Sequence, residues 1–99
     1  MPTAFEAIKE PTRRQILLLL GERERSVNEI AEELKAGQTM VSNHLRVLRD
    51  AGLVQRRVDG PRRMYSVDPE GLAEVIEFLE QFWGKRLKSL RQAVEEQHA

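Results

Sequence analysis

The chain has 99 residues, a length that suits one small domain. It has no cysteine, which excludes disulfide bridges and thiolate metal ligands. Its 16 Lys and Arg balance 16 Asp and Glu, so an affinity for nucleic acid would have to come from a local excess of positive charge. The N-terminus lacks a signal-peptide pattern, and the longest apolar run, Ile16 to Leu20, is too short for a membrane span. We therefore expect a cytoplasmic protein with no membrane partner.

The first twenty residues predict two helices. Residues 3–9 form a short amphipathic helix at most, and its apolar positions are Ala4, Phe5, Ala7 and Ile8. Pro11 suits the first position of the next helix, where a backbone N–H is not needed. The run from Thr12 to Leu20 predicts a buried helix that ends at Gly21.

Two further helices follow with a short turn between them. Ser26 and Glu29 have the spacing of a capping box, which marks Ser26 as an N-cap. The helix that begins there carries one apolar face, made of Val27, Ile30, Ala31 and Leu34. A second helix is predicted from about Gln38 to Ala51, with Gly52 as its left-handed cap. The inner face of this second helix is Val41, Leu45 and Leu48.

A hairpin comes directly after these helices. Residues 53–58 read as a strand, residues 59–62 as a turn, and residues 63–67 alternate polar and apolar side chains as a half-buried strand does. Two helices, a short turn and a hairpin form the layout of a winged helix-turn-helix. The predicted fold is mainly α with a small β-hairpin, and residues 1–99 form a single domain.

The last part of the chain predicts one long amphipathic helix, from about residue 69 to 96. Asp68 is its cap, Pro69 its first residue and Glu70 an acid in its first turn. Its apolar residues lie close to a heptad seam, namely Leu72, Ile76, Leu79, Trp83, Leu87, Leu90 and Val94, with Phe78 and Phe82 beside it. A domain this small cannot cover such a face, so we expect a homodimer that uses this helix.

The charges are unevenly distributed. Residues 38–67 carry six Arg against two Asp, whereas both flanking regions are net acidic. Arg suits phosphates and base edges because its planar guanidinium donates two parallel hydrogen bonds. Exposed arginines can also simply solvate a surface, and charge alone does not decide between the two readings.

The second helix of the motif carries a polar outer face, made of Gln38, Thr39, Ser42, Asn43 and Arg46. These residue types read base edges in a major groove. Any surface helix has a polar side, but the position of this one before an Arg-bearing hairpin favours double-stranded DNA as the partner. Arg62 and Arg63 at the hairpin turn would contact phosphates or a minor groove. Arg56 and Arg57 point to opposite faces of their strand, so we expect one of them to face DNA.

Three segments resemble the ArsR-type winged-helix repressors: Glu10–Leu17, Val41–Leu48 and Ala51–Val54. The similarity extends from about Phe5 to Leu90. It implies a homodimer that occupies a palindromic operator and represses transcription. It also implies dimerisation through the N-terminal and C-terminal helices. The expected interface residues are therefore Phe5 of the N-terminal helix and, on the C-terminal helix, Leu72, Ile76, Leu79, Trp83 and Leu87.

The sequence departs from the metal-sensing members of this family. Ser26, Val27 and Asn28 stand where some relatives carry cysteines, and the last helix has no histidine before His98. One histidine without partners does not form a tetrahedral site, so we expect no metal and no cofactor. The sequence does not decide whether a protein or small-molecule effector exists. His98 reads as a solvated tail residue and His44 as a half-buried supporting side chain. Met40 could contact a thymine methyl group or pack within the protein.

Two other function classes fit the sequence less well. A winged-helix module that binds another protein without reading DNA would explain the acidic flanks and the aromatic helix, but not the arginines of residues 38–67. An enzyme is not expected, because the sequence offers no nucleophile–base pair, glycine-rich phosphate loop or carboxylate cluster.

Overall fold

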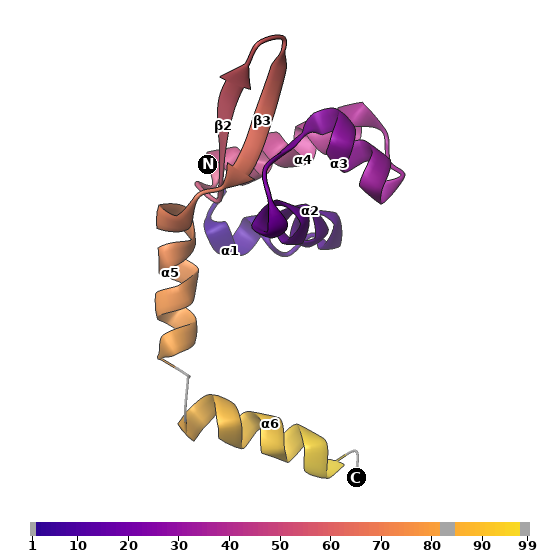
Figure 1. Cartoon of the computed structure of the whole chain (residues 1–99). Coiled ribbons are helices and arrows are strands. Elements are labelled where there is room, and N and C mark those ends of the chain that lie inside the picture. The colour runs from indigo at the N-terminus through magenta and orange to yellow at the C-terminus, as the bar shows by residue number, and fades with distance from the viewer. Residues whose placement is uncertain (1, 82–84, 98–99) are drawn as a thin grey trace.

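The computed structural model describes residues 2–81 and 85–97, without the side chains of Lys85 and Leu87. Its elements in chain order are α1 Ala4–Ala7, α2 Pro11–Glu22, β1 Arg25–Ser26, α3 Val27–Leu34, α4 Gln38–Asp50, β2 Val54–Asp59, β3 Arg62–Val67, α5 Pro69–Glu80 and α6 Lys85–Gln97. The strands form an antiparallel sheet in the order β1-β3-β2. Figure 1 shows the β2–β3 hairpin standing above the packed helices α1–α4, with α5 leading away from them. The predicted fold class is confirmed.

The N-terminal helices are joined by side chains that satisfy their free ends. Glu10 caps α2 by accepting a hydrogen bond from the Arg13 backbone N–H at 2.9 Å, and Pro11 is the first helical residue, as predicted. The side chains of Arg13 and Arg14 reach back to carbonyl oxygens at the end of α1, including that of Ala7 at 2.6 Å. The last carbonyls of a helix lack helical partners, so these bonds fix α1 against α2.

The predicted α2 was wrong in two respects. The helix does not end at Gly21 but continues to Glu22, with Arg23 as its C-cap. It is also not buried along its whole apolar run, because Ile16 and Leu20 lie in the core whereas Leu18 is 72% exposed. Four consecutive leucines must point in different directions around a helix, so one of them necessarily faces solvent.

The helix-turn-helix is formed by α3 and α4. The capping box is confirmed: the Ser26 side chain accepts the Glu29 N–H at 3.2 Å, and the Glu29 carboxylate accepts the Ser26 N–H at 3.0 Å. At the end of α3, Lys35 adopts a left-handed conformation with φ of 53°, which turns the chain toward α4. On α4 the predicted inner residues Val41, Leu45 and Leu48 are fully buried. They join the core that contains Ile16, Ile30 and Leu53.

Strand β1 was not predicted from the sequence. Its two residues pair with β3, with Arg25 opposite Tyr65 and Ser26 opposite Met64. Arg25 is 3% exposed, and its guanidinium donates to the Leu19 carbonyl oxygen at 3.2 Å and to the carboxylates of Glu33 at 3.0 Å and Glu22 at 3.1 Å. A buried guanidinium requires such partners. These bonds tie the start of the sheet to α2 and α3.

The junction between α4 and α5 requires two glycines. Gly52 has a φ of +80°, the left-handed cap that the sequence predicted, and the Leu53 N–H bonds the Leu48 carbonyl oxygen at 2.9 Å. Gly71, in the first turn of α5, approaches the Gly52 carbonyl so closely that a Cβ atom on Gly71 would overlap it. The absence of a side chain at Gly71 therefore allows α5 to start against the end of α4.

Among the described residues, the C-terminal region contains two helices, α5 and α6, where the sequence predicted one helix over residues 69–96. Asp68 caps α5 and Pro69 begins it, as expected, but α5 ends at Glu80 with Gln81 as its C-cap, and α6 begins at Lys85. Within residues 2–81 and 85–97, the helices are all too short or too polar to cross a membrane.

We expect Gly71→Ala and Gly21→Ala to change stability in opposite directions. The new methyl group at position 71 would push against the Gly52 carbonyl and lower the free energy of unfolding by about 1–3 kcal/mol. At Gly21, inside α2, no atom lies within 4 Å of the added Cβ, and the gain in helix propensity should raise the free energy by about 0.5–1 kcal/mol. Urea denaturation measures both; equal effects would contradict the proposed close contact.

Candidate nucleic-acid interface

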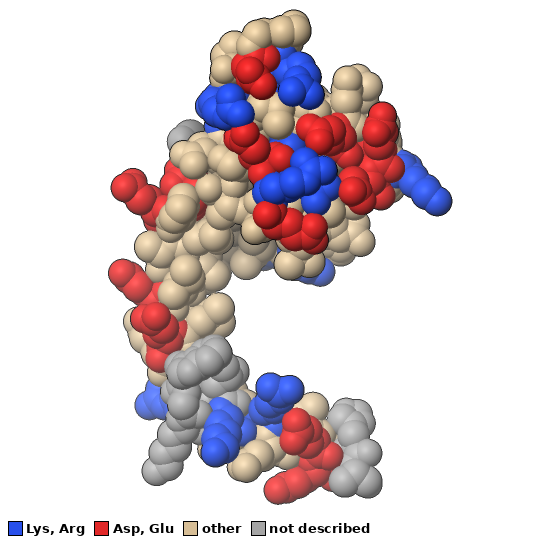
Figure 2. All heavy atoms as spheres, in the orientation of Figure 1, with Lys and Arg blue, Asp and Glu red and all other residues tan. Residues whose placement is uncertain are grey.

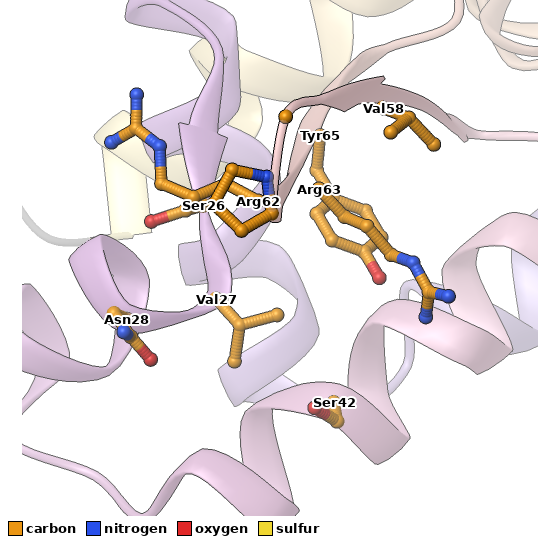
Figure 3. A pocket seen from close by; sticks show the side chains of 10 residues that line it. Ser26, Val27, Asn28, Ser42, Val58, Arg62, Arg63 and Tyr65 are labelled. Carbon is orange, nitrogen blue, oxygen red and sulfur yellow. The ribbon is translucent and has the colours of Figure 1, made fainter.

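A hollow lies between the helix-turn-helix and the wing (Figure 3). Its walls come from the start of α3, one side of α4 and the β2–β3 hairpin. The residues that line it are Ser26, Val27, Asn28, Ser42, Val58, Gly60, Pro61, Arg62, Arg63 and Tyr65. Two of them are arginines and none is acidic, so the hollow suits a negatively charged ligand.

The outer face of α4 is open beside this hollow. All five residues that the sequence predicted to read DNA, Gln38, Thr39, Ser42, Asn43 and Arg46, are exposed. Within the described part of the chain, no hydrogen bond or ion pair occupies their side chains. The N-cap of α4 is Gly37, which supplies no side-chain cap, so the first N–H groups of α4 also remain available. The helix thus presents uncommitted donors and acceptors along one side.

The register of the hairpin separates the two arginines at its turn. Arg63 lies opposite Val58 and on the same face of β3 as Tyr65, whereas Arg62 lies opposite Asp59 on the other face. The Arg62 guanidinium is 3.6 Å from the Asp59 carboxylate. Arg63 has no acidic partner among the described residues, and Figure 3 shows its guanidinium pointing toward α4.

Arg57 is occupied within the protein. Its guanidinium donates two hydrogen bonds to the Glu24 carboxylate, one of them at 3.0 Å. Arg57 pairs with Met64, which in turn pairs with Ser26, so the Arg57 side chain crosses the sheet to reach the residue before β1. Hydrogen bonding from Arg57 lowers the pKa of Glu24, and the same contact raises the pKa of Arg57. Of the two arginines on β2, Arg56 is the one without a described partner.

His44 lies where the sequence placed it, half-buried on the inner side of α4. Its Nε2 atom is 3.8 Å from the Glu10 carboxylate, the cap of α2. Desolvation raises the pKa of Glu10. The hydrogen bond from the Arg13 N–H and the nearby His44 ring act in the opposite direction, and the net pKa of Glu10 is below its ordinary value. His44 therefore faces α2 rather than the open side of α4, while Met40 is 41% exposed.

Charged side chains of both signs gather around β1. Figure 2 shows basic side chains surrounded by acidic ones over α3 and β1, and more basic side chains at the wing. Arg23 pairs with Glu29 at 3.1 Å, and hydrogen bonds from Ser26 and Arg23 lower the pKa of Glu29. Glu24 and Glu29 are therefore both engaged by arginines of the same chain.

Of the residues that line the hollow, the sequence predicted Ser42, Arg62 and Arg63 as site residues and missed the others, among them Asn28, Val58 and Tyr65. Asn28 could have been found as an exposed polar residue in the first turn of α3. Val58 and Tyr65 could be placed beside Arg63 only once the register of the hairpin is known, because Val58 lies opposite Arg63 and Tyr65 lies two residues further along the same strand.

Three of the predicted dimerisation residues, Phe5, Ile76 and Leu79, leave apolar surface exposed on α1 and α5. Phe5 of α1 packs edge-to-face against Phe78 of α5, with ring centroids 5.4 Å apart. Ile76 and Leu79 are about half exposed, whereas Leu72 packs against the core. Trp83 and the side chain of Leu87 lie outside the described residues, as does His98.

The described residues contain no group of three or more His, Cys, Asp or Glu side chains placed to hold one metal ion.

Residues 10–56 match the family model described as bacterial regulatory protein, arsR family. The chain is 38% identical over 92 residues to the HTH-type transcriptional regulator Rv2034 of Mycobacterium tuberculosis, covering 93% of this chain and 86% of the relative. It is 32% identical to the transcriptional repressor SdpR of Bacillus subtilis, covering 86% of this chain and 94% of that one.

Solved structures show the same arrangement of elements. The crystal structure of a possible transcriptional regulator for arsenical resistance superposes with a TM-score of 0.79 at 40% identity, covering 94% of this chain and 97% of that one. A solution structure from Mycobacterium bovis has a TM-score of 0.64 at 34% identity and covers 93% of this chain and 74% of its own. That protein is a homodimeric winged helix-turn-helix DNA-binding domain.

The Glu24–Arg57 pair predicts a pH dependence of stability. The lowered pKa of Glu24 means that its contribution is present above the ordinary value of 4.5 and is lost as the pH falls through the lower folded value. We therefore expect Glu24→Gln to lose less stability than the wild type when the pH falls from neutral to well below 4.5.

Urea denaturation at several pH values measures this difference, with Glu32→Gln as the matched control. Glu32 is an exposed carboxylate of α3 whose side chain has no described ion-pair partner. Parallel pH profiles for Glu24→Gln and the wild type would show that the pair contributes nothing.

Proposed function

Because this chain belongs to the ArsR family of bacterial regulatory proteins, we propose that it is a homodimeric, sequence-specific DNA-binding repressor that occupies a palindromic operator. The observation that carries the proposal is the outer face of α4. Five exposed polar residues there are free of described partners, while the inner face of the same helix is fixed in the core. The similarity to a transcriptional repressor and to a homodimeric DNA-binding domain supports it.

In this proposal α4 is the recognition helix. Arg46 would donate to guanine, Asn43 and Gln38 would pair with adenine, and Ser42 and Thr39 would contact either base. The N-terminal residues of a recognition helix reach deepest into the major groove. Two copies of α4 in a dimer would bind half-sites about 34–36 Å apart, one turn of DNA.

The wing would contact the DNA backbone. Arg63 is free of an acidic partner, and Arg62 shares a loose contact with Asp59 at the turn. Phosphate contacts add affinity for every sequence and make binding depend on salt. We assign Arg62 and Arg63 this positioning role and leave the choice of sequence to α4.

Selection of bound duplexes from a random DNA pool tests the proposal. We expect an inverted repeat with half-sites one turn apart. Arg46→Ala should relax the preference at one base pair of each half-site at a cost of about 1–3 kcal/mol. Arg62→Gln and Arg63→Gln should instead weaken binding to all sequences and reduce the slope of log affinity against log salt by about 1 each.

Binding without enrichment of any sequence would point to a nonspecific DNA protein. A dimer with no affinity for DNA at low salt would favour the alternative, a winged-helix module that binds protein.

We further propose that the homodimer forms through α1 and the C-terminal helices. Phe5, Ile76 and Leu79 expose apolar surface on one side, and Leu90 and Val94 of α6 are more than half exposed. Chains of this length normally have a radius of gyration of about 13 Å, whereas the Cα radius here is 16.0 Å. The extended C-terminal helices leave apolar side chains that a second copy would cover.

A charge on this surface should therefore separate the protomers. We expect Ile76→Glu to sediment as a monomer and to bind the operator at least about tenfold more weakly, because two linked half-sites bind better than one. Glu74→Gln, on the exposed side of α5, is the control and should remain a dimer. A dimeric Ile76→Glu protein with full affinity would place the interface elsewhere.

Regulation by this protein is proposed to be independent of the metal sites found in some relatives. The chain has no cysteine, and its described residues form no cluster of metal ligands. Operator affinity should be the same in EDTA and in zinc-containing buffer. A change of more than a few fold between the two buffers would contradict this proposal.

A further inference from the structure

We propose that the hollow between α3 and the wing is a binding seat for one phosphate group of the DNA backbone. The seat consists of the Tyr65 hydroxyl, the Arg63 guanidinium and the first turn of α3 at Asn28. The inference deepens the proposed function and rests on it, because it adds the Tyr65 hydroxyl and the start of α3 to the backbone contact proposed for Arg63.

Tyr65 gives the strongest indication. The residue is 6% exposed and belongs to the hydrophobic core, yet its hydroxyl has no hydrogen-bond partner among the described residues. No fully buried polar side-chain atom in the described structure lacks a partner, so this hydroxyl must open onto the hollow that Tyr65 lines. Figure 3 shows the oxygen pointing toward α4. Tyrosine hydroxyls in buried positions normally find a partner, and a phosphate oxygen would accept this proton.

Arg63 supplies the charge. It lies two residues before Tyr65, on the same face of β3, and both side chains point toward α4 in Figure 3. It makes no ion pair with a described residue, unlike its neighbour Arg62. A guanidinium that is already paired would have to break that contact to bind phosphate, whereas Arg63 does not.

The first turn of α3 closes the other side. Asn28 is its second residue, exposed and part of the lining. The backbone N–H of Asn28 lies in the first turn of α3, where no earlier carbonyl of the helix can accept its hydrogen bond. The positive end of the helix dipole also favours an anion there. The nearby Glu29 carboxylate is held by the Ser26 N–H and by Arg23, which offsets its charge.

The walls of the hollow favour a phosphate group of a DNA backbone over a small ligand that would be buried completely. Apolar side chains, those of Val27, Val58 and Pro61, stand beside the polar groups, and no carboxylate lines the hollow. The opening lies beside Ser42 on α4, so DNA that receives α4 in its major groove would carry its backbone past the seat.

Removal of one hydroxyl tests the seat. Tyr65→Phe keeps the ring in the core and removes only the proposed donor, and Ser66→Ala removes a hydroxyl from the opposite face of β3 as the control. Anisotropy with a mixed-sequence duplex at low salt should show about tenfold weaker binding by Tyr65→Phe and unchanged binding by Ser66→Ala. Equal affinities of Tyr65→Phe and wild type would overturn the seat and leave the proposed function standing.

Asn28→Asp separates binding from folding. An acid in the first turn stabilises a helix, so thermal stability should be kept or raised. The same charge would repel a phosphate in the seat, and DNA affinity should fall at least about tenfold, further than for Asn28→Ala. An Asn28→Asp protein that binds DNA as tightly as wild type would overturn the proposal.

Two further arms identify the source of the phosphate. In the selected operator, a neutral methylphosphonate at one position per half-site should weaken DNA binding by the wild type but have little effect on binding by Tyr65→Phe. If the affinity losses from the methylphosphonate and from Tyr65→Phe simply add at every position, the proposed contact is contradicted. If wild type binds no DNA, the proposed function is wrong. NMR titration with inorganic phosphate then decides the seat: shifts at Asn28 that disappear in Tyr65→Phe support a free-anion site, and no shifts overturn it.

Discussion

The burial of one face of α4 is the constraint on which the rest of the site depends. Val41, Leu45 and Leu48 recur at intervals of four and three, and all three are fully enclosed by residues from α2, α3 and the loop after Gly52. A rotation of the helix by one residue would move all three out of the core. The same packing therefore determines which residues point outward, and it holds them without involving their polar groups.

Pairing within the chain determines which charges remain available to a ligand. The chain is neutral overall, and many of its arginines serve the fold: Arg13 and Arg14 close α1, Arg25 anchors β1, and Arg57 links the wing to Glu24. Arg46 and Arg63 keep no described partner. Net charge is thus a poor guide to this surface, since the acidic residues that balance the sum mostly lie on other faces or are already engaged.

Local rules explain why much of this architecture could be predicted. The capping box at Ser26, the proline that begins α2 and the glycine cap after α4 each depend on residues within one or two helical turns. The polar face of α4 follows from its periodicity. Such signals act over a few residues, so one sequence suffices to find them.

Features that depend on distant residues could not be found in the same way. Strand β1 has two residues and exists only because β3 is beside it. The Glu24–Arg57 pair joins residues 33 positions apart, and the close approach of Gly71 to Gly52 depends on how α5 leaves the sheet. The sequence assigned no polar role to Tyr65, because the alternation of residues 63–67 predicted only a half-buried strand. A role for its hydroxyl becomes visible only when Arg63 and the start of α3 are seen to line the same hollow.

The anchoring of the wing connects these observations. Arg25 ties β1 to α2 and α3, and the Glu24–Arg57 pair ties β2 to the segment before β1, so both edges of the sheet are linked to the part of the chain that packs against α4. A protein that must contact a groove and a backbone at once gains affinity when both surfaces are set before binding, because less conformational freedom is then lost on association. The ion pairs near the wing are exposed and individually weak. Their contribution is geometric, because the pair with Glu24 holds the Arg57 side chain along the sheet.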